Sequence, residues 1–363
     1  MTDGKTQRLL NLDLLRLASA LLVVLFHFGF RMGITGEGGG TGFPELAPFA
    51  MWGHVGLLIF FAISGYVIAM SAENRSAFDF AVGRTARLWP TFVVCASVTA
   101  LVLLWWPVAG IAPPTFAQWL AHLAIVSRAL GQPFLDGAYW TIVYEIVFYA
   151  WVFLLMATGL FHKHWRMAVL AWLALSILNE GLIDSGAVRK LFITEYSGFF
   201  AFGLVLFKLQ RDFSRADLPL LALAAFWACL EPWLVEPFFV EEYGVRHSFG
   251  ALALTGSFAL SVMTLAALAP SAPLPPRLAA GLGALTYPLY LLHQHIGYAA
   301  FAHFGGVANR WLVAVLLLAA LLLAAAAIAR WIEPSGKRLI QRAAKPFRGR
   351  LPLFLSARRP ATP

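Results

Sequence analysis

Long apolar stretches without alternation of polar and apolar residues dominate the chain. A transmembrane helix needs about 17 to 25 mostly apolar residues, and continuous runs of that length predict helices rather than the strands of a barrel. We predict about ten such helices, of which the one near 194–209 is the shortest. The runs lie near residues 9–30, 50–70, 88–107, 139–160, 166–183, 194–209, 217–235, 249–268, 283–303 and 310–332.

Composition points to the same class of protein. Hydrophobic residues make up 60% of the 363 residues and charged residues only 12%, with a mean hydropathy of +0.74. A soluble domain carries about 25% charged residues. We therefore predict an all-α, polytopic integral membrane helix bundle in the inner or plasma membrane, with the lipid bilayer as its first partner.

The distribution of Lys and Arg predicts the orientation of this bundle. With ten helices and a cytoplasmic N-terminus, twenty of the 27 basic residues fall on the cytoplasmic side, six fall outside, and Arg16 lies within a helix. Because basic residues concentrate in cytoplasmic loops, both termini are predicted to be cytoplasmic. We divide the chain into a transmembrane domain, 1–335, and a basic cytoplasmic tail, 336–363. The tail supplies much of the net charge of +9, which suits anionic lipid headgroups and requires no nucleic-acid partner.

The first predicted helix, "DLLRLASALLVVLFHFGF" (13–30), carries three polar groups: Asp13, Arg16 and His27. Asp or Arg at a helix centre costs about 2.5 to 3.5 kcal/mol on insertion scales. Arg16 and His27 are separated by about 20° around the helix axis and about 16 Å along it, so they share a face with Asp13. Such intramembrane groups usually mark functional sites. The alternative is an Asp–Arg pair that only locks helix packing, with His27 bonded to a backbone carbonyl.

Four other segments carry polar groups at or inside predicted helices. Ser64 lies in the second helix, Arg84 and Arg87 directly precede the third, Glu145 lies in the fourth, and His293 lies in the ninth. The segments are "GHVGLLIFFAISGYVIAMS" (53–71), "RTARLWP" (84–90), "YWTIVYEIVFYAW" (139–151) and "TYPLYLLHQHIG" (286–297).

Taken in order with "LDLLRLASALLVVLFH", these segments resemble the acyltransferase-3 family of bacterial membrane O-acyltransferases. The matching features are the Arg and His of the first helix, Gly…Phe-Phe…Ser-Gly-aromatic, Arg-x-x-Arg, Trp-Thr…Glu…Phe-Tyr, and Tyr-x-x-Tyr-Leu-x-His. The resemblance covers nearly the whole chain. Leu14 departs from it, because many relatives have Gly there.

The resemblance implies transfer of an acyl group, commonly acetyl, from cytoplasmic acyl-CoA to a hydroxyl of an outward-facing glycan or similar acceptor. A hydroxyl that attacks a thioester needs a base of near-neutral pKa, and His27 suits that role. Glu145 would orient the imidazole or balance its charge. Arg16 would line the path of the donor, and Arg84 with Arg87 would hold the phosphates of CoA. The alternative for that pair is simple topology anchoring.

Several candidates keep two interpretations. His54 is a rival base, and His293 either lines the site or packs between helices. Ser64 is a nucleophile without an adjacent base, or part of a Ser-Gly pair that allows close helix packing. The His-x-His pairs at 162–164 and 293–295 lack an evident third ligand, so we expect no metal.

Two interpretations also remain open for each of two outer loops, and other functions remain open for the protein. Segment 33–48 is a lid over the acceptor or a solvated linker. The acidic residues Glu231, Glu236, Glu241 and Glu242 meet sugar hydroxyls or are simply solvated. The rivals to an enzyme are a transporter of a small solute or of protons and a non-catalytic membrane scaffold. Dependence on acyl-CoA separates the three.

Overall fold

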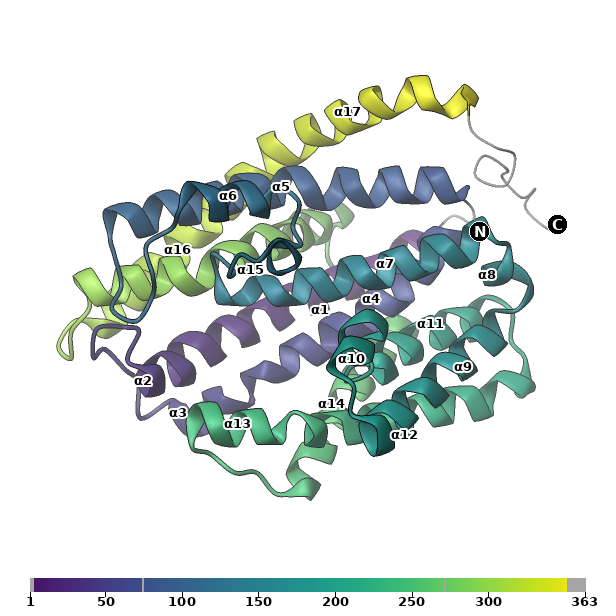
Figure 1. The fold of residues 1–363 in the computed structure, drawn as a ribbon, viewed down its shortest axis with the longest axis horizontal. Helices are drawn as coiled ribbons and strands as arrows, with labels where there is room; N and C mark the ends of the chain where they lie inside the picture. Colours follow the sequence, from purple (N-terminus) through teal and green to yellow (C-terminus); the bar gives the residue numbers. More distant parts are fainter. Residues whose placement is uncertain (1–2, 74, 271, 351–363) are drawn as a thin grey trace. The chain divides into compact units, whose positions relative to one another are not determined.

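A computed structural model describes residues 3–73, 75–270 and 272–350, and every regular element in these ranges is helical (Figure 1). Among the described residues, nine helical segments are long and apolar enough to cross a membrane. The chain is therefore an all-α, multi-pass membrane protein, as the sequence predicts. The segments are Leu10–Thr35, Ala47–Glu73, Ala77–Trp105, Gly137–Ala157, Trp165–Ile183, Gly186–Arg211, Arg215–Tyr243, Phe249–Leu268 and Arg310–Arg348.

The prediction of ten spans differs from these nine at α15 (Pro276–Phe304). Its 29 residues extend for about 43 Å, which is long enough to cross a bilayer. Its run of Tyr, His and Gln residues makes it less apolar than the nine segments above. Conversely, the weak helix predicted near 194–209 is α11 (Ser197–Arg211), and it belongs to one of the nine.

The chain forms two compact units, whose segments alternate along the sequence and which we describe separately. Unit 1 comprises Met1–Leu57, Ala86–Val143 and Pro270–Leu339. Unit 2 comprises Leu58–Thr85, Tyr144–Ala269 and Ile340–Pro363.

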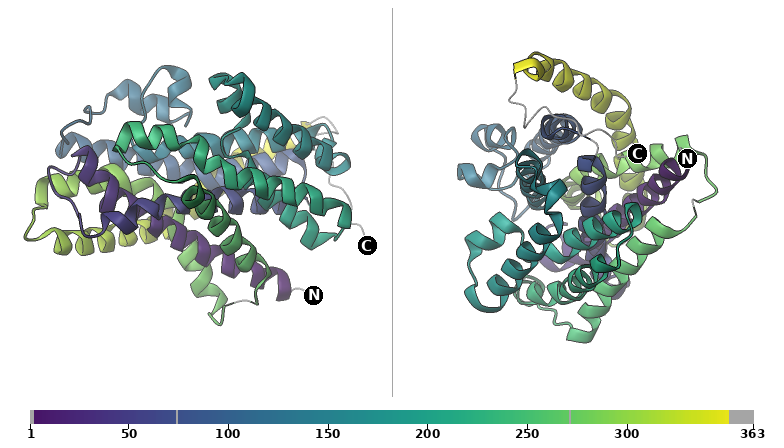
Figure 2. Two further views of the ribbon diagram at one scale, coloured as in Figure 1. Left: turned by 90° about the horizontal axis from the view of Figure 1, so that it is seen from below. Right: turned by 90° about the vertical axis from the view of Figure 1, so that its right-hand side faces the viewer.

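In unit 1, α1 (Asp3–Phe26) packs along α15, and α16 (Arg310–Ala327) packs on the other side of α15 (Figures 1 and 2). Small residues of α15 allow this approach. A Cβ atom at Gly283 would lie 2.6 Å from the Cβ of Asp13, and one at Gly297 would overlap the ring of Phe28. Because glycine lets helix backbones come close, the face of α1 that carries Asp13 lies directly against α15.

The segment 33–48 is packed rather than free. After α2 (Met32–Thr35) the chain runs to α3 (Ala47–Ala50), and Phe43 on the way is only 3% exposed. Arg310 donates a hydrogen bond to the carbonyl oxygen of Gly42 at 2.9 Å. The segment is therefore anchored to the start of α16, although half of its residues are exposed, and its interpretation as a lid or a linker stays a prediction.

Helix α5 (Ala77–Trp105) begins eleven residues before the predicted third span. The hydroxyl of Ser76 accepts a hydrogen bond from the backbone N–H of Asp79 at 3.1 Å and so caps its first turn. Arg84 and Arg87 thus lie inside a helix, not ahead of it. The hydropathy pattern misses these turns because they carry polar residues.

Unit 2 contains most of α4 (Val55–Glu73) and α7 (Trp140–Ala157) together with the shorter helices that follow them. A Cβ atom at Gly65 or at Gly203 would overlap a backbone carbonyl oxygen of the facing helix, α11 or α4 respectively. This confirms that the Ser-Gly pair permits close packing. The following helices are α8 (Leu160–Lys163), α9 (Trp165–Leu178), α10 (Gly186–Phe192), α11, α12 (Leu218–Leu234), α13 (Glu236–Tyr243) and α14 (Phe249–Leu268).

Two of the four acidic residues predicted to be solvated or to meet sugars are buried instead. Glu231 is 0% exposed and accepts hydrogen bonds from the backbone N–H of Gly198 at 2.7 Å and from the hydroxyl of Ser197 at 3.1 Å. Glu236 is 5% exposed and contacts the Nδ1 of His247 at 2.9 Å. Both carboxylates therefore hold the local structure.

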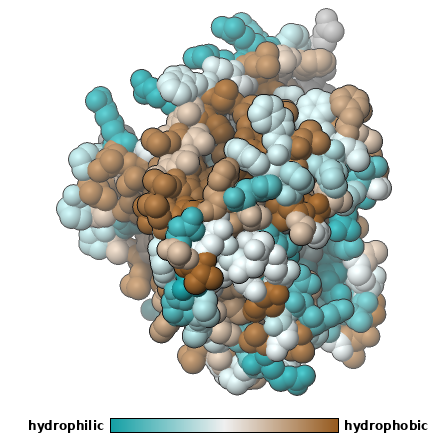
Figure 3. Space-filling model, turned by 90° about the vertical axis from the view of Figure 1, so that its left-hand side faces the viewer, coloured by the Kyte–Doolittle hydropathy of each residue, from teal (hydrophilic) through white to brown (hydrophobic). Residues whose placement is uncertain are grey.

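The predicted tail begins within α17 (Glu333–Ala344), which a short 3-10 helix, Lys345–Arg350, follows. Its remaining residues, 351–363, lie outside the described part of the chain, so the boundary at 335 stays a prediction. Figure 3 shows hydrophobic and hydrophilic residues interspersed on the face that it draws.

Candidate active site

The first helix does not end at residue 30 as predicted. After Phe26 it continues as a π-helical turn, His27–Arg31, and then as α2. The backbone N–H of Met32 bonds to the carbonyl oxygen of His27, five residues earlier. Such wider turns are rare and occur frequently at functional sites. The predicted base, His27, is the first residue of this turn.

Two helices of unit 1 bring His27 and His293 together. The Nδ1 atom of His27 lies 3.0 Å from the carbonyl oxygen of Val23 and 3.0 Å from the Nε2 atom of His293. The Nδ1 atom of His293 lies 2.7 Å from the carbonyl oxygen of Tyr290. His293 is fully buried and His27 is half-buried. His293 thus packs between helices and contacts the candidate base, and its role in the site stays a prediction.

A buried carboxylate that the sequence analysis did not single out fixes α15 near this pair. Asp136 is 0% exposed and accepts hydrogen bonds from the backbone N–H groups of Ala138 and His295, both at 2.9 Å. The imidazole of His295 contacts the carbonyl oxygen of Leu135 at 2.9 Å. The Asp-Gly sequence before an apolar run is a helix-capping signal and could have revealed Asp136.

His122, at the end of α6 (Phe116–His122), steadies the loop that carries Asp136. Burial lowers the pKa of His122 below its usual range, so the imidazole is neutral near pH 7. Its Nε2 atom accepts a hydrogen bond from the backbone N–H of Leu135 at 3.0 Å, and its Nδ1 atom faces the carbonyl oxygen of Gln118 at 2.7 Å. This histidine therefore has a structural role.

A second polar cluster of unit 1 lies eleven residues before His27 along α1. The guanidinium of Arg16 bonds to the carboxylate of Asp13 at 3.0 Å, and the charge of Arg87 on α5 also acts on Asp13. The predicted Asp–Arg pair thus exists. Its two side chains are 15% and 22% exposed for Arg16 and Asp13 respectively, so the pair is accessible as well as bonded.

A third cluster continues from the π-helical turn. Arg31 bonds to the carboxylate of Glu37 at 2.6 Å and to the hydroxyl of Tyr298 at 3.1 Å. The hydroxyl of Thr35 also donates to Glu37, at 2.8 Å. The topology prediction counts Arg31 as a loop residue. It lies in the helix instead, one turn beyond His27.

Glu145 belongs to unit 2, and there it is held by hydroxyl groups. Tyr149 donates a short hydrogen bond to its carboxylate, and Ser64 donates one at 3.4 Å. The ring of Tyr149 also lies 5.8 Å from the guanidinium carbon of Arg84, which bonds to the hydroxyl of Ser71 at 3.2 Å. Unit 2 therefore places Arg84 next to the partner of Glu145. Tyr149 follows Glu145 by four residues, a helical spacing that could have identified this pair.

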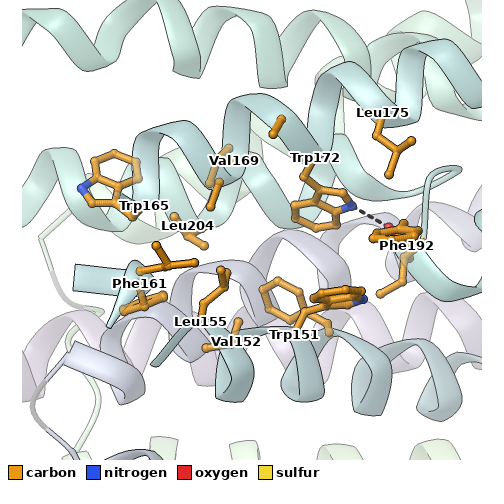
Figure 4. A pocket seen from close by; sticks show the side chains of 15 residues that line it. Trp151, Val152, Leu155, Phe161, Trp165, Val169, Trp172, Leu175, Phe192 and Leu204 are labelled. Atoms are coloured by element: carbon orange, nitrogen blue, oxygen red, sulfur yellow. Dashed lines mark hydrogen bonds between the residues drawn. The ribbon is translucent and has the colours of Figure 1, made fainter. Parts of the chain in front are cut away.

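Unit 2 also contains an apolar cavity of about 340 Å³. Its walls come from α7, α9, α10 and their neighbours, and the indole N–H of Trp172 donates to the carbonyl oxygen of Phe192 at 2.5 Å (Figure 4). The cavity is lined by Phe, Trp, Leu, Val, Ile and Ala side chains alone. Because none of these can act as an acid, a base or a nucleophile, the cavity offers no catalytic chemistry.

The remaining histidine candidates are His54 and the His-x-His pairs. The Nδ1 atom of His54 faces the carbonyl oxygen of Met51 at 2.8 Å, and its ring lies 6.0 Å from that of Phe26. Over the ranges that the structure describes, no three His, Cys, Asp or Glu side chains are grouped so that they could hold a metal ion.

Comparisons with known proteins identify the family. A family model described as an acyltransferase domain matches residues 9–330. One curated relative, an O-acetyl transferase of Shigella phage Sf6, is 30% identical over 127 residues, which are 35% of this chain and 34% of the relative. The match thus spans about a third of that protein's length. No solved structure matches. The matched region includes the polar first helix and the Arg-x-x-Arg pair. Because it covers most of the chain, the chain belongs to the acyltransferase-3 family of membrane acyltransferases.

Proposed function

We propose that the protein is a membrane O-acyltransferase. It moves an acyl group, commonly acetyl, from cytoplasmic acyl-CoA to a hydroxyl of an extracytoplasmic glycan or related cell-envelope acceptor. The observation that carries the proposal is the placement of His27 at the start of a π-helical turn, within the region that the family model matches. The named O-acetyl transferase relative supports the choice of acyl group and acceptor atom.

The proposed reaction uses His27 as a general base. Its imidazole takes the proton of the acceptor hydroxyl while the hydroxyl oxygen attacks the carbonyl carbon of the thioester. The C–O bond forms, the C–S bond breaks, and the imidazolium returns the proton to the sulfur, so that free CoA leaves as a thiol. Positioned bases of this kind contribute about a hundred- to ten-thousand-fold to the rate.

Arginine side chains would hold the donor. Arg84 and Arg87 are one helical turn apart on α5, and their guanidinium groups suit the phosphates of CoA. Arg16 is kept in place by Asp13 and stays partly exposed. We assign Arg16 to the path between the phosphate-binding end and the base.

Glu145 would balance the positive charge that forms on His27. Its carboxylate accepts hydrogen bonds from the hydroxyls of Tyr149 and Ser64, which are neutral groups. A carboxylate near an imidazolium stabilises the protonated form.

The positive-inside distribution supports cytoplasmic termini and a cytoplasmic donor. The acyl group would then pass along a polar track while the CoA moiety stays on its own side. The protein would lie in the inner or plasma membrane, with its basic C-terminal segment against anionic lipids.

Mass spectrometry of cell-envelope glycans from cells with and without the protein tests this function. We expect alkali-labile acetyl esters that disappear when the gene is deleted and return with the wild-type gene. A transporter or scaffold would leave purified acetyl-CoA intact, so release of CoA thiol by the purified protein in the presence of envelope glycan is the second readout. The absence of both the acetyl esters and the CoA thiol would overturn the proposal.

A further inference from the structure

The histidine pair of unit 1 fixes the position of every ring proton, provided that both imidazoles are neutral. The Nδ1 atom of His293 faces the carbonyl oxygen of Tyr290 at 2.7 Å. A carbonyl oxygen can only accept, so this nitrogen carries the proton of His293. The Nε2 atom of His293 therefore has a free lone pair and must accept a hydrogen bond.

The partner of that lone pair is His27. The Nδ1 atom of His27 lies 3.0 Å from the Nε2 atom of His293 and 3.0 Å from the carbonyl oxygen of Val23. Both neighbours are acceptors, so the Nδ1 atom of His27 carries the proton and shares it between them. A neutral imidazole has one N–H group. The Nε2 atom of His27 is consequently left with its lone pair, as a base requires.

We propose that His293 is a positioning residue that holds His27 in the tautomer whose Nε2 atom accepts the hydroxyl proton. This inference rests on the function proposed above. His293 does for His27 what the buried carboxylate does in a catalytic triad, namely to bind Nδ1–H and orient the ring. A neutral imidazole in this place orients the ring of His27 but does not balance its positive charge.

The backbone around the pair supports a fixed geometry. His293 is fully buried, with 0% of its surface accessible to solvent. The next turn of α15 is tied down by Asp136, which accepts a hydrogen bond from the backbone N–H of His295 at 2.9 Å. Gly297, where a side chain would overlap the ring of Phe28, keeps α15 close to the π-helical turn. Each ring also contacts a carbonyl oxygen of its own helix, that of Val23 for His27 and that of Tyr290 for His293.

The test compares three variants in the purified full-length protein, with acetyl-CoA as donor and envelope glycan as acceptor. His293→Leu removes the acceptor, and we expect kcat to fall about a hundredfold or more while the donor KM changes less than about threefold. His293→Gln places an amide oxygen close to the position of Nε2, and we expect it to recover at least about tenfold of that loss. His295→Gln, on the same helix and bonded to Leu135 instead of His27, is the matched control and should lower kcat less than tenfold.

Each outcome has one meaning. Equal loss in His293→Leu and His293→Gln, or an equal loss in His295→Gln, would show a structural role and overturn the inference. Wild-type protein without transfer activity would refute the proposed function instead. Nitrogen-15 NMR of ring-labelled protein in lipid, with His27→Asn to assign the signal, gives an independent readout: we expect a protonated Nδ1 and an unprotonated Nε2. A protonated Nε2 on His27 in the neutral state would also overturn the inference.

Discussion

The two units differ in the partners of their ionisable side chains. Both units contain ion pairs: Glu73 bonds to Lys208 at 2.6 Å and Arg189 bonds to Glu180 at 2.7 Å in unit 2, and Arg16 bonds to Asp13 at 3.0 Å in unit 1. In unit 1 two imidazoles face each other and two carbonyl oxygens in the interior. Compensated pairs lock a helix bundle, whereas neutral imidazoles can take up and release a proton. The imidazole pair of unit 1 is where we propose that the proton is transferred.

In unit 2 the described partners of Glu145 are hydroxyl groups, and those of Glu231 are a hydroxyl group and a backbone N–H. A carboxylate held in this way keeps its charge available for another group. We therefore propose that Glu145 contributes charge to the reaction.

The largest expected effect is that of His27→Ala. We expect kcat to fall about a hundred- to ten-thousand-fold, because a positioned general base contributes about that much to the rate. Thermal unfolding in detergent should change little by comparison. Near wild-type transfer by a folded His27→Ala protein would place the base elsewhere, with His54 the first residue to examine.

Glu145→Gln should have the next largest effect. It keeps an acceptor for Tyr149 and Ser64 but removes the charge, and charge-assisted hydrogen bonds contribute about 1.5 to 3 kcal/mol. We expect kcat to fall about ten- to a hundredfold, with an unchanged donor KM. If Glu145→Gln retained wild-type kcat, Glu145 would supply no charge to the reaction.

The double variant Arg84→Ala and Arg87→Ala should raise the donor KM more than it lowers kcat. Each lost charge-assisted contact with a phosphate is worth about 1.5 kcal/mol or more, so we expect KM to rise at least about tenfold. The single variants show which arginine dominates. An unchanged affinity for acetyl-CoA, measured by binding to the purified protein, would return the pair to topology anchoring.

The smallest effect on kcat is expected from Glu231→Leu, which should act on stability. It leaves the backbone N–H of Gly198 without its acceptor, at a cost of about 1 to 3 kcal/mol. The midpoint of thermal unfolding should drop while kcat of the folded fraction stays within about twofold. Glu241→Leu, at an exposed position, is the control. A selective loss of kcat in Glu231→Leu would contradict the structural role.

The sequence predicts the helices well because the cost of burying backbone in lipid makes apolar runs nearly sufficient to locate them. It misses what polar side chains do at helix ends. The π-helical turn at His27 and the early start of α5 depend on local hydrogen bonds that hydropathy does not register. The buried positions of Glu231 and Glu236 depend on contacts with residues distant in the sequence.

The same limit applies to the site. Spacing along α1 predicts that Asp13, Arg16 and His27 share a face, since helical geometry is regular over eleven residues. The contact of His27 with His293 joins residues 266 positions apart. Only the packing of α1 on α15, which the glycines of α15 allow, brings those two rings together.

The most direct test of the account uses sealed, inside-out membrane vesicles that contain envelope glycan. Radiolabelled acetyl-CoA, which does not cross the membrane, is supplied on the exposed cytoplasmic face, and label is measured in alkali-labile esters of the enclosed glycan. We predict that vesicles with the wild-type protein acquire label that becomes accessible to glycan-degrading enzymes only after lysis, and that vesicles with His27→Ala do not. Label confined to glycan on the same side as the donor, or equal labelling by His27→Ala, would contradict the account.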